Sequence, residues 1–572
     1  MLNRLSPKSY GRYLLFIAGM GGLLYGVDVG IIAAALLYLD KTINLTIAQT
    51  SLIAAAVFGG SMASSLVAGV LADWLGRKTL MIISGLLFVL SILLIFVSQN
   101  FAVLFTGRLL QGVSGGFIAV VVPLYLAECL SAKTRGRGSA IFQLFLTIGI
   151  AAAAGVGWYF AHNADTAIAA AKGNLDLMWV AQNHAWRGMF LAVVYPGMVF
   201  FVGSFFLSES PRWLFRKGRL DDALRALRRS SSEEEAQVQM HEMTETAAAA
   251  TPSAVKTSGS LLQRKYVVPF VMACVILACN QTTGINSILS YLVIILKQAG
   301  LNASHATQGD FVVKALNVVM TVVAVALVDR KGRKFLLVLG TSGVIVALGT
   351  AAVVFHTFET KRTDVKQAVV LRIHGDAMDV PVASLAGQQT GATVLSVLYD
   401  YQRDTTHLSL FARFKNLFDS GEKSATVLST DSDPVLHIAP EGEDAGRPLE
   451  IKAASLGPVA TVTTGWTIAG CLALFIAAFA VGPGVVVWLA LSELMPTRIR
   501  SSGMGIALLI NQGVSTLIAG LFLPVVSNYG YAAMFGFWTL CTVVYFITAA
   551  FFLPETKGKT LEEIELGFAK GK

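Results

Sequence analysis

Charged residues inside long apolar stretches are the first candidates for chemistry in this chain of 572 residues. Asp28 lies in the middle of the apolar stretch 13–37, with Tyr25 on the same helical face at i−3. Arg108 stands near the start of another such stretch. A charge at the centre of a bilayer costs about 2.5–3.5 kcal/mol on insertion scales, so both residues need a reason to be there. Either Asp28 is a protonatable carboxylate whose ionised form pairs with Arg108, or the two residues form a permanent salt bridge between helices.

Neutral amides form a second set within apolar sequence. They are Gln143, Asn280, Gln281, Asn286, Asn317 and Asn511, and Trp488 adds an aromatic face. Amides both donate and accept hydrogen bonds, so they suit a ligand with many hydroxyl groups, and an aromatic ring stacks on its C–H face. No cluster of cations is evident on these faces, which argues against a phosphorylated or carboxylated ligand. The alternative for each amide is a hydrogen bond that merely links two helices.

The elements that position these residues are membrane-spanning helices. The chain is 55% hydrophobic and only 14% charged, which excludes a string of soluble domains and excludes intrinsic disorder. A spanning helix needs about 20 apolar residues. Twelve stretches qualify: 13–37, 48–72, 79–98, 101–127, 138–160, 188–208, 266–296, 311–328, 335–356, 464–492, 501–525 and 530–553. The five cysteines lie in apolar runs without paired spacing, and we find no metal motif or P-loop, so no cofactor is expected.

The distribution of positive charge predicts the orientation. Lysines and arginines gather at the N-terminus, in every second loop and after the last span, whereas the other loops hold little beyond Lys41, Lys172 and Lys297. This asymmetry predicts a multi-pass protein of the plasma (inner) membrane with both termini in the cytoplasm. It also explains the net charge of +9, so the lipid bilayer rather than nucleic acid is the expected partner.

The chain repeats itself. The segment Leu71–Lys78 (LADWLGRK) matches Leu327–Lys334 (LVDRKGRK), and further pairs of Glu and Arg recur after later spans. Two six-helix halves arranged in parallel are the natural interpretation. The later pairs are more widely spaced than the first, which places an insertion in the second half.

The insertion occupies 357–463, which is polar and proline-rich. Its β-branched segments Ala368–Ile373, Thr393–Leu398 and His407–Phe411 predict short strands, so a small β-rich external domain is expected; a loosely ordered loop is the alternative. The stretch around Ser230–Ser260 is expected to be flexible. We therefore divide the chain into an N-terminal half (1–208), a cytoplasmic linker with amphipathic helices (209–264), helices 7–9 (265–356), the external insert (357–463), helices 10–12 (464–553) and a cytoplasmic tail (554–572).

Several motifs in this order resemble the sugar porter family of the major facilitator superfamily. They are Gly107-Arg108, Pro123–Glu128 (PLYLAE) with Arg135-Gly136, Ser208–Leu214 (SESPRWL), Gln281–Asn286 (QTTGIN), Gly482-Pro483-Gly484 and Pro554–Gly558 (PETKG). The match covers nearly the whole chain except the insert. The resemblance implies an all-α major facilitator fold of twelve helices and transport of a sugar by alternating access in a functional monomer, with no enzymatic activity.

The resemblance also implies roles for individual residues. It assigns Gln143, Gln281, Asn286, Asn317, Trp488 and Asn511 to the sugar site, to which we add Asn280 and Tyr25 as departures from the family pattern. Proton-coupled sugar porters carry Asp at the position of Asp28, which favours coupling over a permanent salt bridge with Arg108. On an unbroken helix, Gln281 and Asn286 would be splayed by about 140°, so Gly284 is expected to break the helix and let both reach one cavity.

Repeated charges on the cytoplasmic side predict an inner latch that ties the halves together when the cavity opens outward. Its expected members are Arg77, Glu128, Arg135, Glu209, Arg333, Glu493 and Arg500. The alternative is a solvated basic surface. The leading hypothesis is a proton-coupled monosaccharide symporter; an uncoupled facilitator and a transporter-like sugar sensor remain alternatives.

Overall fold

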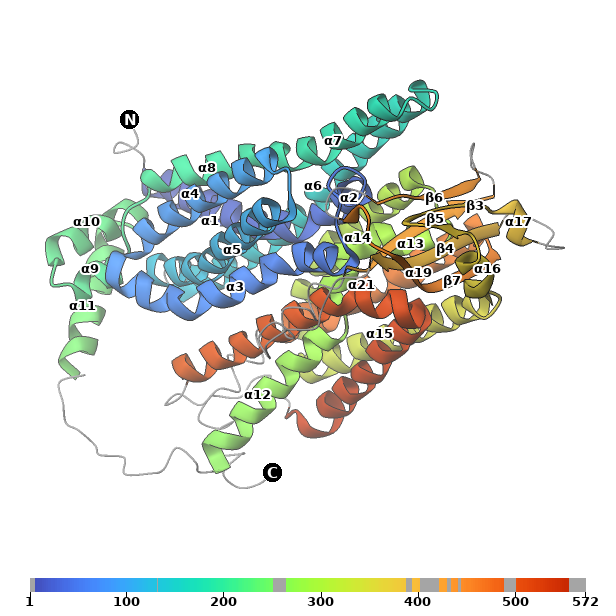
Figure 1. The fold of residues 1–572 in the computed structure, drawn as a ribbon. Helices are drawn as coiled ribbons and strands as arrows, with labels where there is room; N and C mark the ends of the chain where they lie inside the picture. Colours follow the sequence, from blue (N-terminus) through green and yellow to red (C-terminus); the bar gives the residue numbers. More distant parts are fainter. Residues whose placement is uncertain are drawn as a thin grey trace, which may run out of the picture.

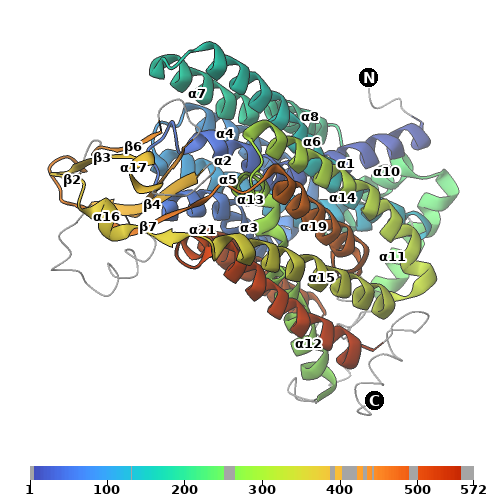
Figure 2. The same cartoon turned by 90° about the vertical axis from the view of Figure 1, so that its right-hand side faces the viewer.

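The computed structural model describes residues 6–130, 132–249, 264–386, 393–401, 421–429, 434–440, 444–487 and 500–554. Two helical bundles lie side by side, and a small β-rich body caps one end (Figure 1). The linker helices α10 (Leu220–Ser230) and α11 (Glu233–Ala249) lie at the opposite end in both views (Figure 2). We call these two ends the insert side and the termini side, since the first turns of α1 (Pro7–Gly30) pack beside α10 at the latter.

The described residues contain eleven helical stretches that are long and apolar enough to cross a membrane. The last of these runs through α21 (Arg500–Ile547), where Gly530 has non-helical φ and ψ angles of 84° and 168°. At about 1.5 Å per residue, its 48 residues exceed the roughly 30 Å needed for one crossing, so this stretch supplies two spans. The twelve expected spans and the major facilitator fold are therefore confirmed.

The N-terminal bundle consists of eight helical segments. They are α1 (Pro7–Gly30), α2 (Ile32–Leu39), α3 (Ile47–Leu75), α4 (Arg77–Val97), α5 (Phe101–Cys129), α6 (Ala132–Ala170), α7 (Leu175–Ala192) and α8 (Val194–Phe205). The expected sixth span, 188–208, begins too late: the helical stretch starts at Leu175 and is interrupted only at Val193, after which α8 begins. Polar residues in the first turns of α7 interrupt the apolar pattern without breaking the helix.

Three short helices follow the N-terminal bundle on the termini side: α9 (Pro211–Arg216), α10 (Leu220–Ser230) and α11 (Glu233–Ala249). The expectation of a flexible stretch from Ser230 is wrong up to Ala249, because α11 is helical there. Ser232 starts this helix by accepting a hydrogen bond from the amide of Glu235, and three glutamates occupy the first turn, where the helix dipole favours negative charge.

The C-terminal bundle contains α12 (Arg264–Thr282), α13 (Ile285–Gln298), α14 (Ala303–Lys331), α15 (Arg333–Glu359), α19 (Val462–Phe479) and α21, with π-helical turns η3 (Ala480–Gly484) and η4 (Thr548–Phe552). The predicted break in the seventh helix is confirmed. Gly284 adopts a left-handed φ of 81° between α12 and α13, and a Cβ there would lie 2.4 Å from the ring of Trp538. Glycine is thus required both by the backbone and by the close approach.

The internal repeat is also confirmed in three dimensions. The α3–α4 and α14–α15 junctions each turn at a glycine with positive φ, 95° at Gly76 and 92° at Gly332. Both α3 and α14 contain 29 residues. The same turn between equally long helices in both bundles indicates two structurally related halves.

The β-rich insert between α15 and α19 is confirmed, and it has its own apolar core. One sheet has the strand order β1-β7-β4-β5 and the other β2-β3-β6. The strands are β1 (Thr363–Asp364), β2 (Ile373–His374), β3 (Ala377–Pro381), β4 (Thr393–Tyr401), β5 (Lys423–Leu428), β6 (Val435–Ile438) and β7 (Leu449–Pro458). The core is formed by inward-facing residues of both sheets, including Leu395, Val397, Leu436 and Leu456.

Two of the three strands predicted for the insert lie within the described residues. The strand expected over Ala368–Ile373 is wrong, since Lys366–Val370 forms helix α16 and only Ile373 starts a strand. The segment Thr393–Leu398 lies within β4 as expected. The segment His407–Phe411 lies outside the described residues.

Candidate functional site

Three of the predicted amides meet at the break between α12 and α13. The Nε2 of Gln281 donates to Oδ1 of Asn511 at 3.0 Å, and Nδ2 of Asn286 donates to Oε1 of Gln281 at 2.9 Å. The same Nδ2 lies 2.7 Å from the hydroxyl of Ser515, one turn from Asn511 on α21. The broken helix thus brings Gln281 and Asn286 to one place, as the sequence predicted. We call Gln281, Asn286, Asn511 and Ser515 the amide cluster.

The amide cluster has unused hydrogen-bonding capacity. The Nδ2 of Asn511 is buried and has no hydrogen-bond partner within the described part of the chain, and the same holds for Oδ1 of Asn280, which precedes Gln281 in the sequence. Buried polar groups are normally paired, so such groups indicate a place where a polar ligand binds. The free amide donor of Asn511 suits the oxygen of a hydroxyl group.

A second polar contact crosses between the two halves beside the amide cluster. The Nε2 of Gln512 on α21 lies 3.1 Å from the phenol oxygen of Tyr25 on α1 and 3.3 Å from the hydroxyl of Ser61 on α3. Gln512 follows Asn511 directly, so this contact joins the amide cluster to the helix that carries Asp28. Ser61 had no distinguishing sequence signal, because serines are common in membrane helices.

Three further residues of the predicted sugar site are not seen to bond to the amide cluster in the described part of the chain. Gln143 on α6 and Asn317 on α14 are half-buried, and no hydrogen bond between either side chain and the amide cluster is seen among the described residues. Trp488 lies outside the described residues. The three stay predictions from the resemblance.

Asp28 and Arg108 lie together in the N-terminal half, without the permanent salt bridge that was one of the two alternatives. Both are almost completely buried. The guanidinium of Arg108 donates to Oε1 of Gln111 at 2.6 Å and approaches the backbone oxygen of Asp28 at 3.4 Å. Among the described contacts, no ion pair joins the two side chains, and both carboxyl oxygens of Asp28 lack a hydrogen-bond partner. Arg108 is therefore held chiefly by an amide and by backbone, so a permanent Asp28–Arg108 salt bridge is not what this structure contains.

Contacts between the two halves also occur on the insert side. The hydroxyl of Tyr291 on α13 lies 3.4 Å from that of Ser51 on α3, which also accepts from the amide of Leu523 at 3.2 Å. The amide of Ile47, at the start of α3, donates to the backbone oxygen of Glu422 in the insert at 3.0 Å. These contacts join the two halves on the insert side.

The family model described as "Sugar (and other) transporter" matches residues 14–373 and 452–568. The chain belongs to this sugar transporter family. The gap between the two matched ranges falls inside the β-rich insert, so the insert is an addition to the family's common core.

Curated relatives resemble the transporter over nearly its whole length. The glucose transporter GlcP of Staphylococcus epidermidis is 28% identical over 556 residues, which cover 97% of this chain and 96% of that protein. The galactose-proton symporter of Escherichia coli K12 is 25% identical over 572 residues, covering 99% and 96%. Both relatives are named as transporters. This agrees with the expectation from the sequence that the chain is not an enzyme.

Solved structures confirm the fold. The inward open conformation of the xylose transporter XylE from E. coli superposes with a TM-score of 0.66 at 19% identity, covering 96% of this chain and 98% of that one. A partially occluded inward open form gives the same TM-score at the same identity.

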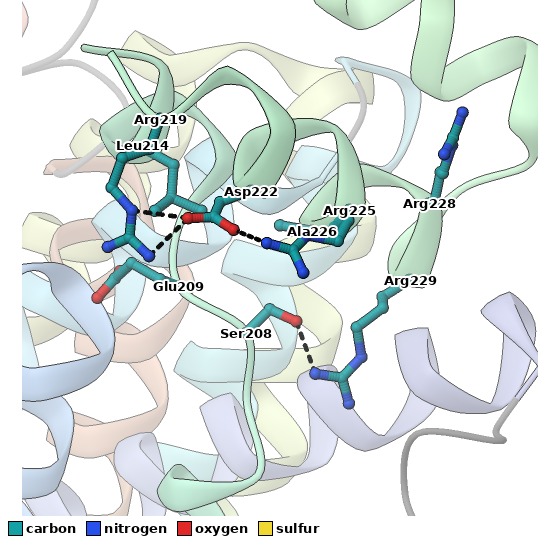
Figure 3. A pocket seen from close by; sticks show the side chains of 9 residues that line it. All are labelled: Ser208, Glu209, Leu214, Arg219, Asp222, Arg225, Ala226, Arg228 and Arg229. Atoms are coloured by element: carbon teal, nitrogen blue, oxygen red, sulfur yellow. Dashed lines mark hydrogen bonds and ion pairs between the residues drawn. The ribbon is translucent and has the colours of Figure 1, made fainter. Parts of the chain in front are cut away.

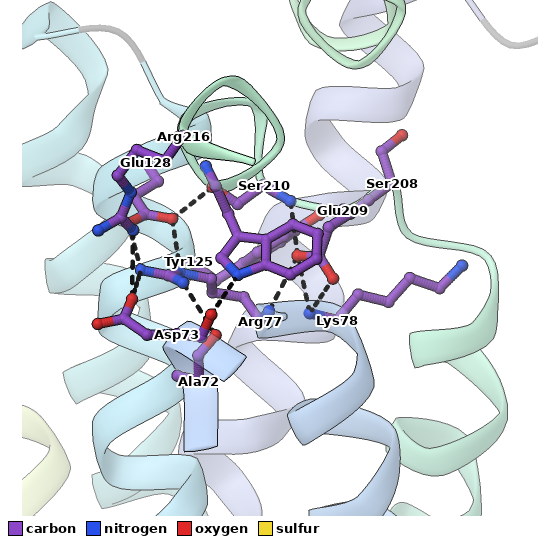
Figure 4. A network of polar contacts seen from close by, with 11 residues as sticks. Ala72, Asp73, Arg77, Lys78, Tyr125, Glu128, Ser208, Glu209, Ser210 and Arg216 are labelled. Carbon is purple, nitrogen blue, oxygen red and sulfur yellow. Dashed lines mark hydrogen bonds and ion pairs between the residues drawn. The ribbon is translucent and has the colours of Figure 1, made fainter. Parts of the chain in front are cut away.

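On the termini side, Arg77 of the transporter lies at the centre of a polar network (Figure 4). Its side chain is 2% exposed and forms ion pairs at 2.8 Å with both Asp73 and Glu128. The carboxylate of Glu209 accepts from the backbone amides of Arg77 and Lys78 at 2.9 and 3.1 Å. Burial raises the pKa of Glu209 above its ordinary value, although the amides of Ser210, Lys78 and Arg77 oppose the shift.

This network contains three residues of the predicted latch. The contacts described for Arg77, Glu128 and Glu209 all lie within the N-terminal half and its linker, so in this conformation they do not join the two halves. Glu493 and the side chains of Arg135 and Arg500 lie outside the described residues, and Arg333 begins α15 in the other half. The latch between halves stays a prediction.

A basic hollow of about 490 Å³ lies among the linker helices α9 and α10 (Figure 3). Asp222 lies between Arg219, 2.6 Å away, and Arg225, and Arg229 donates to the hydroxyl of Ser208 at 2.9 Å. Hydrogen bonds from Arg219 lower the pKa of Asp222. The hollow is charged and solvated, unlike the amide cluster, and we assign it to the basic surface of the termini side.

Two charged residues of α14 were missed by the sequence interpretation. Asp310 and Lys314 form a fully buried ion pair whose Nζ–Oδ1 distance is 2.8 Å. The expected eighth span began at 311, which left Asp310 in a loop. Only the i, i+4 spacing of opposite charges hinted at the pair.

Proposed function

We propose that this sugar transporter is a proton-coupled monosaccharide symporter that works by alternating access. The amide cluster supports a neutral, hydroxyl-rich substrate, since it offers paired amides together with the free amide donor of Asn511. Its position at a broken helix is typical of transporter binding sites.

One observation carries the coupling half of the proposal. Asp28 is a buried carboxyl group in a membrane helix, and its side chain lacks a hydrogen-bond partner among the described residues. An ionised carboxylate in such a place is costly, so a change in the water or the cation that reaches Asp28 changes its affinity for a proton. Tyr25 lies one turn away on the same helix and contacts Gln512 beside the amide cluster. The proton site and the sugar site therefore share α1.

Symport follows if sugar and proton favour the same conformation. Sugar bound at the amide cluster displaces or strengthens the Gln512–Tyr25 contact and thereby shifts α1. A shift of α1 changes the surroundings of Asp28 and hence its affinity for a proton. The galactose-proton symporter among the relatives supports the proposal of proton coupling.

We further propose that both termini are cytoplasmic, that the insert is external and that the protein resides in the plasma membrane as a functional monomer. The charge asymmetry of the loops supports the orientation. The domain boundaries given for the sequence follow from the same topology.

The test is uptake of labelled monosaccharides into proteoliposomes with and without an imposed pH gradient. Accumulation above the external concentration only with an acidic outside supports symport. Equilibration without accumulation in either condition would instead identify a facilitator, and binding without any flux would identify a sensor.

A further inference from the structure

The buried pair Asp310–Lys314 is the least expected feature of the membrane region. Lys314 is 0% exposed and Asp310 is 1% exposed. Removing two charges from water is expensive, and their mutual attraction repays the cost only with further hydrogen bonds. A buried pair inside a membrane helix therefore needs a role beyond stability.

Lys314 makes one further contact that reaches the other half. Its Nζ lies 3.1 Å from the backbone oxygen of Gly30 and 2.9 Å from Oδ2 of Asp310. Gly30 is the last residue of α1, and α2 begins at Ile32. The carbonyl oxygens at the end of a helix carry partial negative charge, and lysine side chains bind there.

The position of this contact connects it with the transport cycle. It lies in the insert-side part of the molecule, as do the Tyr291–Ser51 and Ile47–Glu422 contacts. Lys314 contacts α1 at Gly30, two residues after Asp28. Opening the insert side must separate α1 from α14 and break this contact, because the two helices belong to different halves.

We infer that Lys314 is a gate residue that holds the insert side closed by capping the end of α1, and that Asp310 is the positioning residue that aims it. The inference rests on the proposed alternating-access function. When the gate opens, Lys314 keeps its partner Asp310 on the same helix, so its charge is never left alone. The pair thereby stabilises the closed insert side, and the insert side can still reopen because Lys314 and Asp310 stay paired.

The test measures the distance between the halves directly. Spin labels are attached at Leu175→Cys and Val462→Cys, two exposed positions at the insert-side ends of α7 and α19, in an otherwise cysteine-free background. Distances are recorded by pulsed electron resonance in lipid nanodiscs without sugar or pH gradient. Lys314→Met should increase the long-distance population at least threefold, and Asp310→Asn should shift it in the same direction.

Two further variants make the result interpretable. Lys366→Met removes an exposed lysine of the insert and should leave the distances unchanged. The double variant Asp310→Asn/Lys314→Met contains no uncompensated charge, so it reports on the gate even if a single variant misfolds. Parental distances in a folded Lys314→Met and in the double variant would overturn the gate.

The outcome is separable from the proposed function. A distance shift in a protein that shows no pH-driven uptake would leave the gate intact and refute symport. Unchanged distances in a protein with pH-driven uptake would refute the gate alone.

Discussion

Replacing Gln281 by alanine tests the amide cluster most directly. Gln281 is 7% exposed, and it donates to Asn511 and accepts from Asn286 at 3.0 and 2.9 Å. The substitution removes one side chain from the sugar's hydrogen-bonding partners and also releases Asn511 and Asn286 from their fixed positions. Leaving a buried polar group unpaired costs about 1–3 kcal/mol.

That free energy converts into a measurable loss of affinity. Since about 1.4 kcal/mol corresponds to a factor of ten, the dissociation constant for the preferred monosaccharide should rise by about 5- to 150-fold. Isothermal titration of purified protein against a panel of hexoses and pentoses measures this change. Asn528→Ala is the matched control, because Asn528 is an exposed amide of α21 that bonds only locally to Pro524 in the described structure.

A double substitution sharpens the result. Gln281 and Asn286 share a hydrogen bond, so the effects of Gln281→Ala and Asn286→Ala should not add. Additive effects would show that the two side chains bind sugar independently. Parental affinity of Gln281→Ala for every sugar that the parent binds would refute the assignment of the site.

The other predictions concern coupling, the insert and the helix break. Asp28→Asn should abolish pH-driven accumulation but retain sugar binding and sugar–sugar exchange, because it removes the titrating group and keeps its size; uptake and counterflow measure this. Replacement of residues 360–460 by a short Gly/Ser linker should preserve transport, since β1 pairs with β7 and the insert's ends therefore lie together. Gly284→Ala should sharply reduce the yield of folded protein on size-exclusion chromatography, because the added Cβ meets Trp538 at 2.4 Å.

Each of these predictions has an opposing result. Uphill uptake that persists in Asp28→Asn would refute its coupling role. Loss of transport in a folded, membrane-inserted deletion of the insert would show that the insert takes part in the cycle. Normal folding of Gly284→Ala would mean that α12 and α13 can be joined without the left-handed residue.

Much of the architecture follows from the lengths of the apolar segments and from the turn and polar residues that separate them. Twelve apolar runs, two Gly-Arg-Lys turns and a polar insertion were sufficient for the two halves and the added β-rich body. Gly284 was predictable as a helix break because two amides on opposite faces had to reach one site. The false strand at Ala368–Ile373 shows the limit of this approach, since a six-residue β-branched segment fits a short helix equally well.

The missing part of the site depends on contacts between distant segments. Nothing local in the sequence of Ser61 or Ser515 separates them from other serines in membrane helices. Lys314 needs the carbonyl oxygen of Gly30, a backbone atom that every residue possesses, so only the folded arrangement identifies its partner. The same holds for Arg108, which the sequence paired with the Asp28 carboxylate and which the structure directs to Gln111.

Because β1 and β7 pair with each other, the point where the insert joins the transporter is a suitable place to fuse an engineered reporter domain. Thr363 faces Leu456 across the ladder, so chain entering and leaving the insert is already held together. The insert is covalently attached to the C-terminal half, and its Glu422 accepts a hydrogen bond from the backbone amide of Ile47 in the N-terminal half. A fluorescent domain grafted in place of the insert would thus be anchored to one half and lie against the other, where its emission could record each opening of the transporter in living cells.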